Sequence, residues 1–252
     1  MSEQRVWTAA LLVIGDEILS GRTQDKNVGQ VATWLNRHGI RLCEVRIVPD
    51  HEGRIAAATN ELRHMYDYLI TTGGIGPTHD DITVDSIAAA FGVSVVVHPE
   101  ARRVLEEYYA SRGGLTDARL RMARVPEGAE LIENPLSGAP GVKMDNVYML
   151  AGVPSIAANM LEALEGKLRG GRPLVSVTVG AYATESEVAD LLRETEATHE
   201  GVAIGSYPFF RDGRHGANFV IRSEEEERAQ ECAEDLTGRL TEAGLDPVAG
   251  GI

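Results

Sequence analysis

The sequence is poor in cysteine and has no long apolar run. Its 252 residues include only two cysteines, Cys43 and Cys232, which lie far apart and outside any CxxC or Cys/His spacing. This pattern excludes a disulfide framework and a structural zinc site. No apolar run approaches the roughly 18 residues of a membrane-spanning helix, and the N-terminus lacks a basic segment followed by an apolar core. We therefore expect a cytoplasmic protein with no membrane partner.

Basic residues are also scarce. The 24 lysines and arginines are outnumbered by 38 aspartates and glutamates, which gives a formal net charge of -14. A nucleic-acid-binding surface needs a basic stripe that displaces counterions from the phosphate backbone, and the sequence offers none. We therefore expect a small-molecule partner and no nucleic acid.

Strand-like and helix-like patterns alternate through the first part of the chain. The continuous apolar run from Trp7 to Ile14 predicts a strand that is buried on both faces. Strand-like runs at 40–48 and 68–72 then alternate with helical apolar spacing at 27–37 and 52–65. This order predicts an α/β fold with a mostly parallel sheet and right-handed crossovers.

The rest of the chain divides at Gly170-Gly171-Arg172-Pro173 into a first domain, 1–169, and a second domain, 173–252. Before that boundary the sequence predicts a helix at 83–91, a strand at 93–97, helices at 100–112 and from Pro154 to about Leu168, and a hairpin around 142–150. After it come a strand at 174–179, a helix at 185–198, strands at 202–207 and 217–222, and a helix at 224–243. This second order is a split βαββα unit and predicts a small α+β domain.

The segment from Thr71 to Thr83 carries the strongest functional signal. It follows a predicted strand and contains Gly73, Gly74 and Gly76. Without Cβ atoms at these positions a ligand can approach the backbone, and the N–H groups of the turn can face an anion such as a phosphate. The Gly-Gly-Ile-Gly pattern by itself is weak evidence, because it matches neither the dinucleotide fingerprint nor the phosphate loop.

Acidic residues accompany this turn. Asp80 and Asp81 lie in the same segment, the run Gly15-Asp16-Glu17 follows the first predicted strand, and Asp50 follows the second. Carboxylates beside an anion site repel the anion unless a divalent cation lies between them. Because ligands of a doubly wound sheet bind at the carboxyl ends of its strands, the three loops predict one metal-and-phosphate site.

Each of these acids has a structural alternative. Asp80 or Asp81 can cap the helix that begins near Thr83, Asp50 can be a helix cap, and Asp16 can occupy a turn. Their convergence favours a binding site, because independent caps have no reason to gather at one edge of a sheet.

Several motifs together resemble the CinA-type proteins, the family named competence/damage-inducible protein A. They are Ile14-Gly15-Asp16-Glu17-Ile18-Leu19-Ser20-Gly21, Asp25-Lys26-Asn27, Val48-Pro49-Asp50, Thr71 to Thr83, Val125-Pro126-Glu127-Gly128-Ala129, Asn134-Pro135, Ala139-Pro140-Gly141 and Gly152-Val153-Pro154. The resemblance covers about residues 7–168. It implies the three-layer molybdopterin-binding (MogA/MoaB-like) fold, which also occurs at the N-terminus of eukaryotic FAD synthases. The run Gly205-Ser206-Tyr207-Pro208 resembles the small domain that follows in this family.

The resemblance implies metal-dependent chemistry on a small-molecule nucleotide or a pterin. In the molybdopterin adenylyltransferase relatives, the Gly-Gly-x-Gly turn binds pterin or phosphate, and the acids that match Asp50 and Asp81 are linked to catalysis with magnesium. We therefore expect Asp50 and Asp81 to be catalytic, and Mg²⁺ or another divalent cation to bind Asp16, Asp50, Asp80 and Asp81. The expected substrate-binding residues are Gly15, Thr72, Gly73, Gly74, Gly76, Pro77, Ser137, Gly138, Pro140, Gly141, Gly152 and Pro154.

The CinA branch is associated with metal-dependent hydrolysis of the pyrophosphate in ADP-ribose-like nucleotides. The sequence therefore predicts a hydrolase acting on a nucleotide pyrophosphate such as ADP-ribose or FAD. One alternative is molybdopterin binding or adenylylation in molybdenum cofactor biosynthesis. Another is a non-catalytic nucleotide-binding protein, because Ile156 stands where the family has an acidic residue.

The resemblance also predicts the absence of one activity and the oligomeric state. The C-terminal amidase domain of full-length CinA has no counterpart here, so we expect no amidase activity. Relatives of this fold form dimers or trimers, and by that analogy we expect a homo-oligomer.

Overall fold

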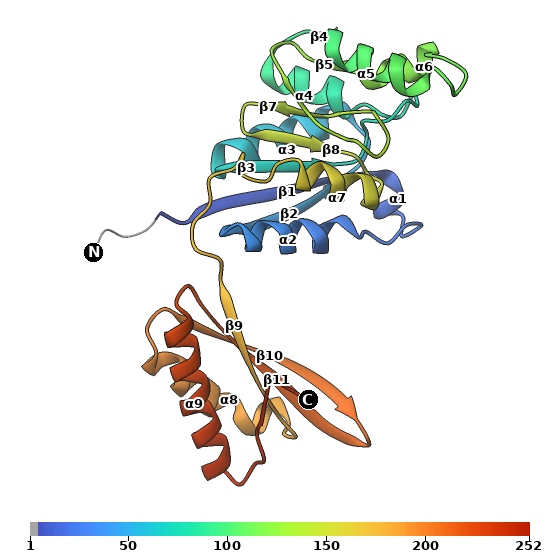
Figure 1. Cartoon of the computed structure of the whole chain (residues 1–252). Coiled ribbons are helices and arrows are strands. Elements are labelled where there is room, and N and C mark those ends of the chain that lie inside the picture. The colour runs from blue at the N-terminus through green and yellow to red at the C-terminus, as the bar shows by residue number, and fades with distance from the viewer. Residues whose placement is uncertain (1–4) are drawn as a thin grey trace. The chain divides into compact units, whose positions relative to one another are not determined.

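The computed structural model describes residues 5–252, which form two compact units. The first unit ends at Gly171 and the second begins at Arg172. Figure 1 shows the elements of both units along the chain. None of the helices in the described range is both long and apolar enough to cross a membrane.

The first unit is built on a six-stranded sheet with the strand order β2-β1-β3-β8-β7-β6. These strands are β1 (Trp7–Ile14), β2 (Ile40–Val48), β3 (Tyr68–Thr72), β6 (Glu130–Ile132), β7 (Gly141–Met144) and β8 (Val147–Leu150). β1 pairs in parallel with β2 and β3, and β3 pairs in parallel with β8. β7 and β6 continue the sheet antiparallel. The predicted mostly parallel sheet is confirmed.

Helices cover both faces of this sheet. Successive side chains of β1 point to opposite faces, so they pack against different helices. Leu11 lies in a core cluster with residues of α2 (Asn27–Arg37) and α7 (Pro154–Glu162). Leu12 lies in a second cluster with residues of α3 (Glu52–Met65) and α4 (Thr83–Phe91). The predicted three-layer architecture is confirmed, and every residue of β1 from Ala9 to Ile14 is buried.

A long excursion separates α4 from β6. It contains β4 (Val95–Val97), α5 (Pro99–Tyr109), α6 (Asp117–Leu120), the 3₁₀ helix η1 (Arg121–Ala123) and β5 (Arg124–Pro126). β4 and β5 pair antiparallel. Leu105 of α5 and Ala123 of η1 belong to a small core of their own, which holds the excursion together.

Three predicted bounds in this unit are wrong. The strand expected from Val93 begins at Val95, because the N–H of Val93 bonds the carbonyl oxygen of Ala88 and closes α4. The helix expected at 100–112 spans Pro99–Tyr109. The helix expected to reach Leu168 stops at Glu162, since the chain continues in turns whose N–H groups bond carbonyls three residues back.

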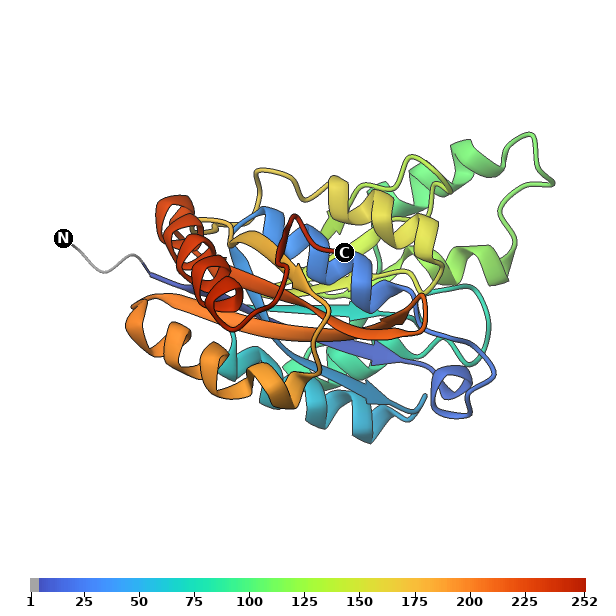
Figure 2. The same cartoon turned by 90° about the horizontal axis from the view of Figure 1, so that it is seen from below.

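The second unit is a four-stranded antiparallel sheet with the order β10-β11-β9-β12. Its elements are β9 (Val175–Ala181), α8 (Glu185–Thr198), β10 (Val202–Arg211), β11 (Arg214–Ser223), α9 (Glu226–Glu242) and β12 (Val248–Ala249). In both views α8 and α9 run side by side against this sheet (Figures 1 and 2). The predicted small α+β domain is confirmed.

The hairpin of the second unit is longer than predicted. Asp212 and Gly213 form its tip, with φ angles of 54° and 74°. Both central residues have positive φ, as the tight hairpin turns that match strand twist require, so pairing continues to Arg211 and Arg214.

Candidate active site

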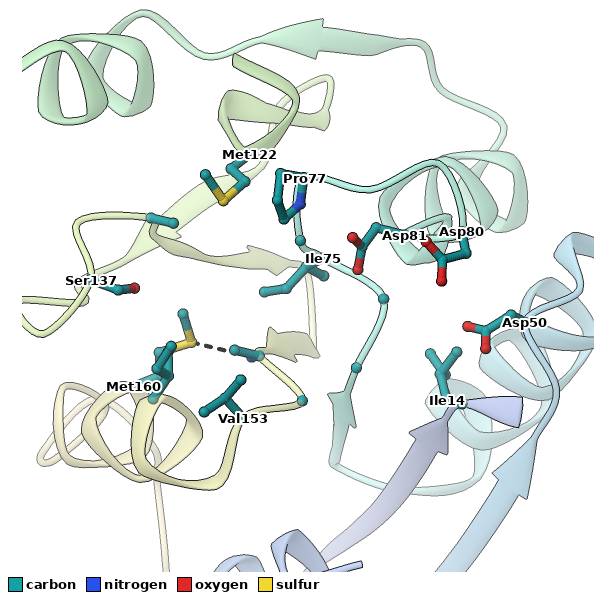
Figure 3. A pocket seen from close by; sticks show the side chains of 18 of the residues that line it. Ile14, Asp50, Ile75, Pro77, Asp80, Asp81, Met122, Ser137, Val153 and Met160 are labelled. Carbon is teal, nitrogen blue, oxygen red and sulfur yellow. Dashed lines mark hydrogen bonds between the residues drawn. The ribbon is translucent and has the colours of Figure 1, made fainter. Parts of the chain in front are cut away.

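A cavity of about 540 Å³ opens in the first unit, where the parallel strands end. Its lining comes from the ends of β1, β2, β3 and β8, from the excursion and from α7 (Figure 3). A cavity of this size suits a nucleotide-sized ligand. The prediction that the loops after β1, β2 and β3 lie together is confirmed by this lining.

The predicted site residues fall into three groups. Those that line the cavity are Gly15, Asp50, Gly73, Gly74, Gly76, Pro77, Asp80, Asp81, Ser137, Pro140 and Gly152. Thr72 and Pro154 line a neighbouring cavity of about 70 Å³, and Asp16 lines an adjoining hollow. Gly138 and Gly141 lie outside the linings of these cavities. A Cβ on Gly138 would meet the ring of Tyr108, and Gly141 is buried in β7.

The turn after β3 requires glycine at two successive positions. Gly73 and Gly74 have φ angles of 101° and 66°. A Cβ on Gly73 would clash with the carbonyl oxygen of Ile14, and one on Gly74 would clash with Oγ1 of Thr83. Thr83 fixes the turn, because its Oγ1 donates to the carbonyl oxygen of Gly73 at 2.8 Å and its N–H donates to that of Gly74 at 2.9 Å. The turn is therefore clamped between β1 and α4.

Three successive backbone donors in this turn are available to a ligand. In the range 5–252, no hydrogen bond is donated by the N–H of Gly74, Ile75 or Gly76. All three residues line the cavity. Successive N–H groups of a turn form a concave anion-binding surface, so the turn suits a phosphate oxygen.

Asp81 is held in place beside this turn. Its Oδ2 accepts hydrogen bonds from the N–H of Thr78 at 2.7 Å and from Oγ1 of Thr78 at 2.6 Å. The carboxylate stands next to Gly76, where a Cβ would lie 2.6 Å from Oδ2. The missing side chain of Gly76 therefore makes room for the acid as well as for a ligand.

Asp50 lies at the end of β2, half buried. Its Oδ2 accepts a hydrogen bond from the N–H of Asp16, the first residue of the short helix α1 (Asp16–Leu19), at 2.9 Å. Burial raises the pKa of the Asp50 carboxyl, the hydrogen bond opposes that effect, and the charges of Asp16, Glu17 and Asp80 raise the pKa further. Facing carboxylates thus make the ionised form of Asp50 costly in the absence of a cation.

The prediction that Asp50, Asp80 or Asp81 caps the helix that follows it is wrong. Ile82 occupies the N-cap position of α4, and His51 that of α3. Neither position makes a side-chain cap hydrogen bond. Asp50, Asp80 and Asp81 are therefore not needed to cap the helices that follow them.

The acidic end of the cavity fits a hydrated Mg²⁺. Its described lining includes the carboxylates of Glu17, Asp50, Asp80 and Asp81 and no lysine or arginine, although Arg22 lies in the adjoining hollow. Among residues 5–252, no group of three or more His, Cys, Asp or Glu could hold a metal ion by itself. Mg²⁺ is usually bound by one or two carboxylates, several waters and the phosphates of a substrate. The donor set suits that arrangement better than a closed protein cage.

The other end of the cavity is apolar, and no motif in the sequence predicts it. Met122, Ile75 and Met160 contribute to its lining. The apolar spacing of α7 indicates only that Met160 belongs to a core, and nothing in the sequence connects Met122 with the glycine turn. These residues come together through long-range pairing of the strands.

Two families of known proteins match the chain. One is described as a probable molybdopterin binding domain and matches residues 10–169. The other is described as the FAD synthase middle domain and matches residues 173–249. Together these two matches account for both compact units.

Individual relatives agree with this assignment. A protein from Aeropyrum pernix is 35% identical over 214 residues, which cover 81% of this chain and 79% of that protein. A CinA-like protein from Geobacter metallireducens is 36% identical over 208 residues, which cover 77% of this chain and 50% of that protein. The crystal structure of CinA from Thermoplasma acidophilum is 32% identical with a TM-score of 0.59, and the match covers 64% of this chain and 96% of that one. The chain therefore belongs to the molybdopterin-binding domain family and is similar to its CinA-like members.

Proposed function

We propose that this protein binds a nucleotide pyrophosphate, of the ADP-ribose or FAD kind, and hydrolyses it with the help of a divalent cation. One observation carries the proposal: free backbone donors and four carboxylates line the same cavity, and the lining contains no lysine or arginine among the described residues. Backbone donors suit the phosphate oxygens, and carboxylates suit the cation that a pyrophosphate brings with it. The match of the second unit to a FAD synthase middle domain supports a nucleotide-related role.

The residues of the chain have separate roles in this reaction. The N–H groups of Gly74, Ile75 and Gly76 bind and orient one phosphate. Asp81 is fixed by Thr78 and keeps its orientation when the ligand binds.

Asp50 and Asp80 are the residues that would hold Mg²⁺, which neutralises the pyrophosphate and makes bound water more acidic. We assign the carboxylate of Asp50 to accept the proton of the attacking water, as a bond forms between the water oxygen and one phosphorus and the bond from that phosphorus to the bridging oxygen breaks.

The direct test is turnover. Pure protein is incubated with ADP-ribose, FAD or NAD in the presence of Mg²⁺ or Mn²⁺, and nucleoside monophosphates are measured by chromatography. We expect product with at least one substrate, and loss of that product in Asp50→Asn and Asp81→Asn. Absence of turnover with every substrate and metal overturns the proposal.

A second candidate is nucleotide binding without hydrolysis. It is favoured by Ile156, an apolar residue that lines the cavity and packs against the core cluster of α2 and α7. This candidate predicts that ADP-ribose binds, that Asp81→Asn leaves its affinity unchanged, and that no product forms. Adenylylation of molybdopterin stays a prediction of the sequence resemblance and is tested by adding molybdopterin and ATP to the same assay.

A further inference from the structure

A second, much smaller cavity lies behind the glycine turn. Its volume is about 10 Å³, which is room for about one water molecule. The turn and Asp81 form the wall between the two cavities, because both are lined by Gly74, Ile75, Gly76 and Asp81. The rest of the small cavity is lined by Val84, Asp85, Arg121 and Arg124. Two arginines therefore stand behind an anion site whose front side has none.

The two arginines differ in their partners. Arg124 forms an ion pair with Asp85. Arg121 belongs to η1, and its Nη2 donates a long hydrogen bond, of 3.4 Å, to the carbonyl oxygen of Asp81. Among residues 5–252 the guanidinium of Arg121 forms no ion pair. In a chain with a formal net charge of -14, a half-buried arginine is thus left without a counter-ion.

The Nε of Arg121 is buried as well, and it has no hydrogen-bond partner in the described part of the chain. A buried donor without an acceptor costs free energy, and native structures leave few of them. One water molecule in the small cavity can accept a hydrogen bond from this Nε, but it cannot balance the charge of the guanidinium. That charge is available to an anion on the other side of the turn.

We infer that Arg121 is a positioning residue of the phosphate site, and that its charge attracts the bound phosphate through the turn at Gly74–Gly76. The inference rests on the proposed function for the place of the phosphate. An arginine suits this role because it stays protonated in proteins. A fixed charge behind one layer of backbone, with little water between, acts on a ligand without touching it.

Arg121 also changes how the charge of a pyrophosphate is balanced. Asp50 and Asp80, the residues that would hold Mg²⁺, line the hollow on the acidic side of the site. Arg121 instead shares its cavity with Asp81 and the turn. A bound pyrophosphate is then neutralised from two directions, by the cation at the acidic end and by Arg121 behind the turn.

The test measures the binding of methylenediphosphonate, a pyrophosphate analogue whose P–C–P bridge resists hydrolysis. Calorimetry in MgCl₂ gives its affinity for the wild type and for two variants. Arg121→Gln should weaken binding about tenfold, and Arg121→Lys, which keeps the charge, should stay within about threefold of the wild type. Added NaCl should weaken binding more in the wild type than in Arg121→Gln, because salt screens the attraction. Unchanged affinity in folded Arg121→Gln overturns the inference, and so does a wild type that does not bind the analogue.

A matched control separates this charge from the charge of the chain as a whole. Arg102 lies on α5 in the same excursion, is exposed, pairs with Glu106 and lines neither cavity. Arg102→Gln should therefore bind the analogue like the wild type. Thermal melting checks that each variant is folded. Equal losses of affinity in Arg121→Lys and Arg121→Gln would assign the effect to the shape of the wall and overturn the inference.

The two proposals fail in different ways. If the analogue binds with the expected dependence on Arg121 but no substrate turns over, the hydrolase proposal fails and the role of Arg121 stands. If turnover occurs but Arg121→Gln binds the analogue normally, the role of Arg121 fails and the hydrolase proposal stands. With a substrate that turns over, Arg121→Gln should raise KM about tenfold and change kcat less than about threefold, because the charge acts on binding.

Discussion

The N–H of Asp16 donates a hydrogen bond to Oδ2 of Asp50 at 2.9 Å, so the acidic loops after β1 and β2 are joined to each other. The bond holds Asp50 close to the charges of Asp16 and Glu17, both of which raise its pKa. The hydrogen bond satisfies the N–H of the first residue of α1, and the neighbouring charges make the ionised form of Asp50 costly.

Asp50→Asn should therefore raise the melting temperature at pH 7 in buffer without divalent cations. The asparagine Oδ1 can still accept the N–H of Asp16, while the charge is lost. A carboxyl whose pKa is higher in the folded than in the unfolded protein stabilises the fold at low pH. This contribution is lost as the pH rises through the pKa that the group has in the folded protein. The gain from the substitution should thus be present at neutral pH and vanish below the ordinary aspartate pKa of 3.8.

Thermal melts at about pH 3 and about pH 8 measure this effect. The first pH lies about one unit below the ordinary aspartate pKa and the second about four units above it. Exposed Glu133, replaced by Gln, is the control in the same unit. A lower melting temperature for Asp50→Asn at pH 7 contradicts the prediction.

Mg²⁺ should stabilise the wild-type protein more than Asp50→Asn. A ligand that binds only the folded state adds about 2.7 kcal/mol when its concentration is a hundredfold above its Kd. Melting temperatures are compared in MgCl₂ and in NaCl of equal ionic strength. Equal shifts in the two salts would show that screening, and not binding, causes the effect.

Gly74→Ala should destabilise the first unit by about 2–4 kcal/mol and abolish phosphate binding, because strain at positive φ adds to a clash with Thr83. Gly21→Ala is the matched control. Gly21 has a φ of 72°, close to the 66° of Gly74, but a Cβ there meets nothing within 4 Å. It should cost only about 1–2 kcal/mol. Urea denaturation measures both, and equal losses would exclude a steric role for Thr83.

Thr78→Val should lower turnover by about tenfold or more while the KM for the nucleotide changes little. The substitution removes the hydroxyl that donates to Asp81, and a hydrogen bond to a charged group contributes roughly 1.5–3 kcal/mol. Thr78→Ser keeps the hydroxyl and should retain most of the activity. Steady-state kinetics of both variants decide the matter: equal turnover contradicts the role given to Thr78, and a large rise in KM alone assigns it to binding instead.

The sequence by itself determined the glycine turn, the acids around it and the α/β fold, because these depend on local chemistry. Buried parallel strands appear as continuous apolar runs, and a turn with positive φ at Gly73 and Gly74 needs glycine wherever it occurs. The carboxyl ends of parallel strands share one sheet edge, so the meeting of Asp50 with Asp81 in one cavity could be predicted as well.

Tertiary structure alone decided which neighbours these residues have. Thr83 clamps the glycine turn through a hydrogen bond to Gly73, ten residues earlier, and Met122 and Met160 line one cavity although they pack against different cores. Gly138, which the motif pattern placed in the site, packs instead against Tyr108. Apolar periodicity shows that a side chain is buried, but its partners depend on strand order and loop paths. Those are set by the packing of the whole unit, and not by any local stretch of sequence.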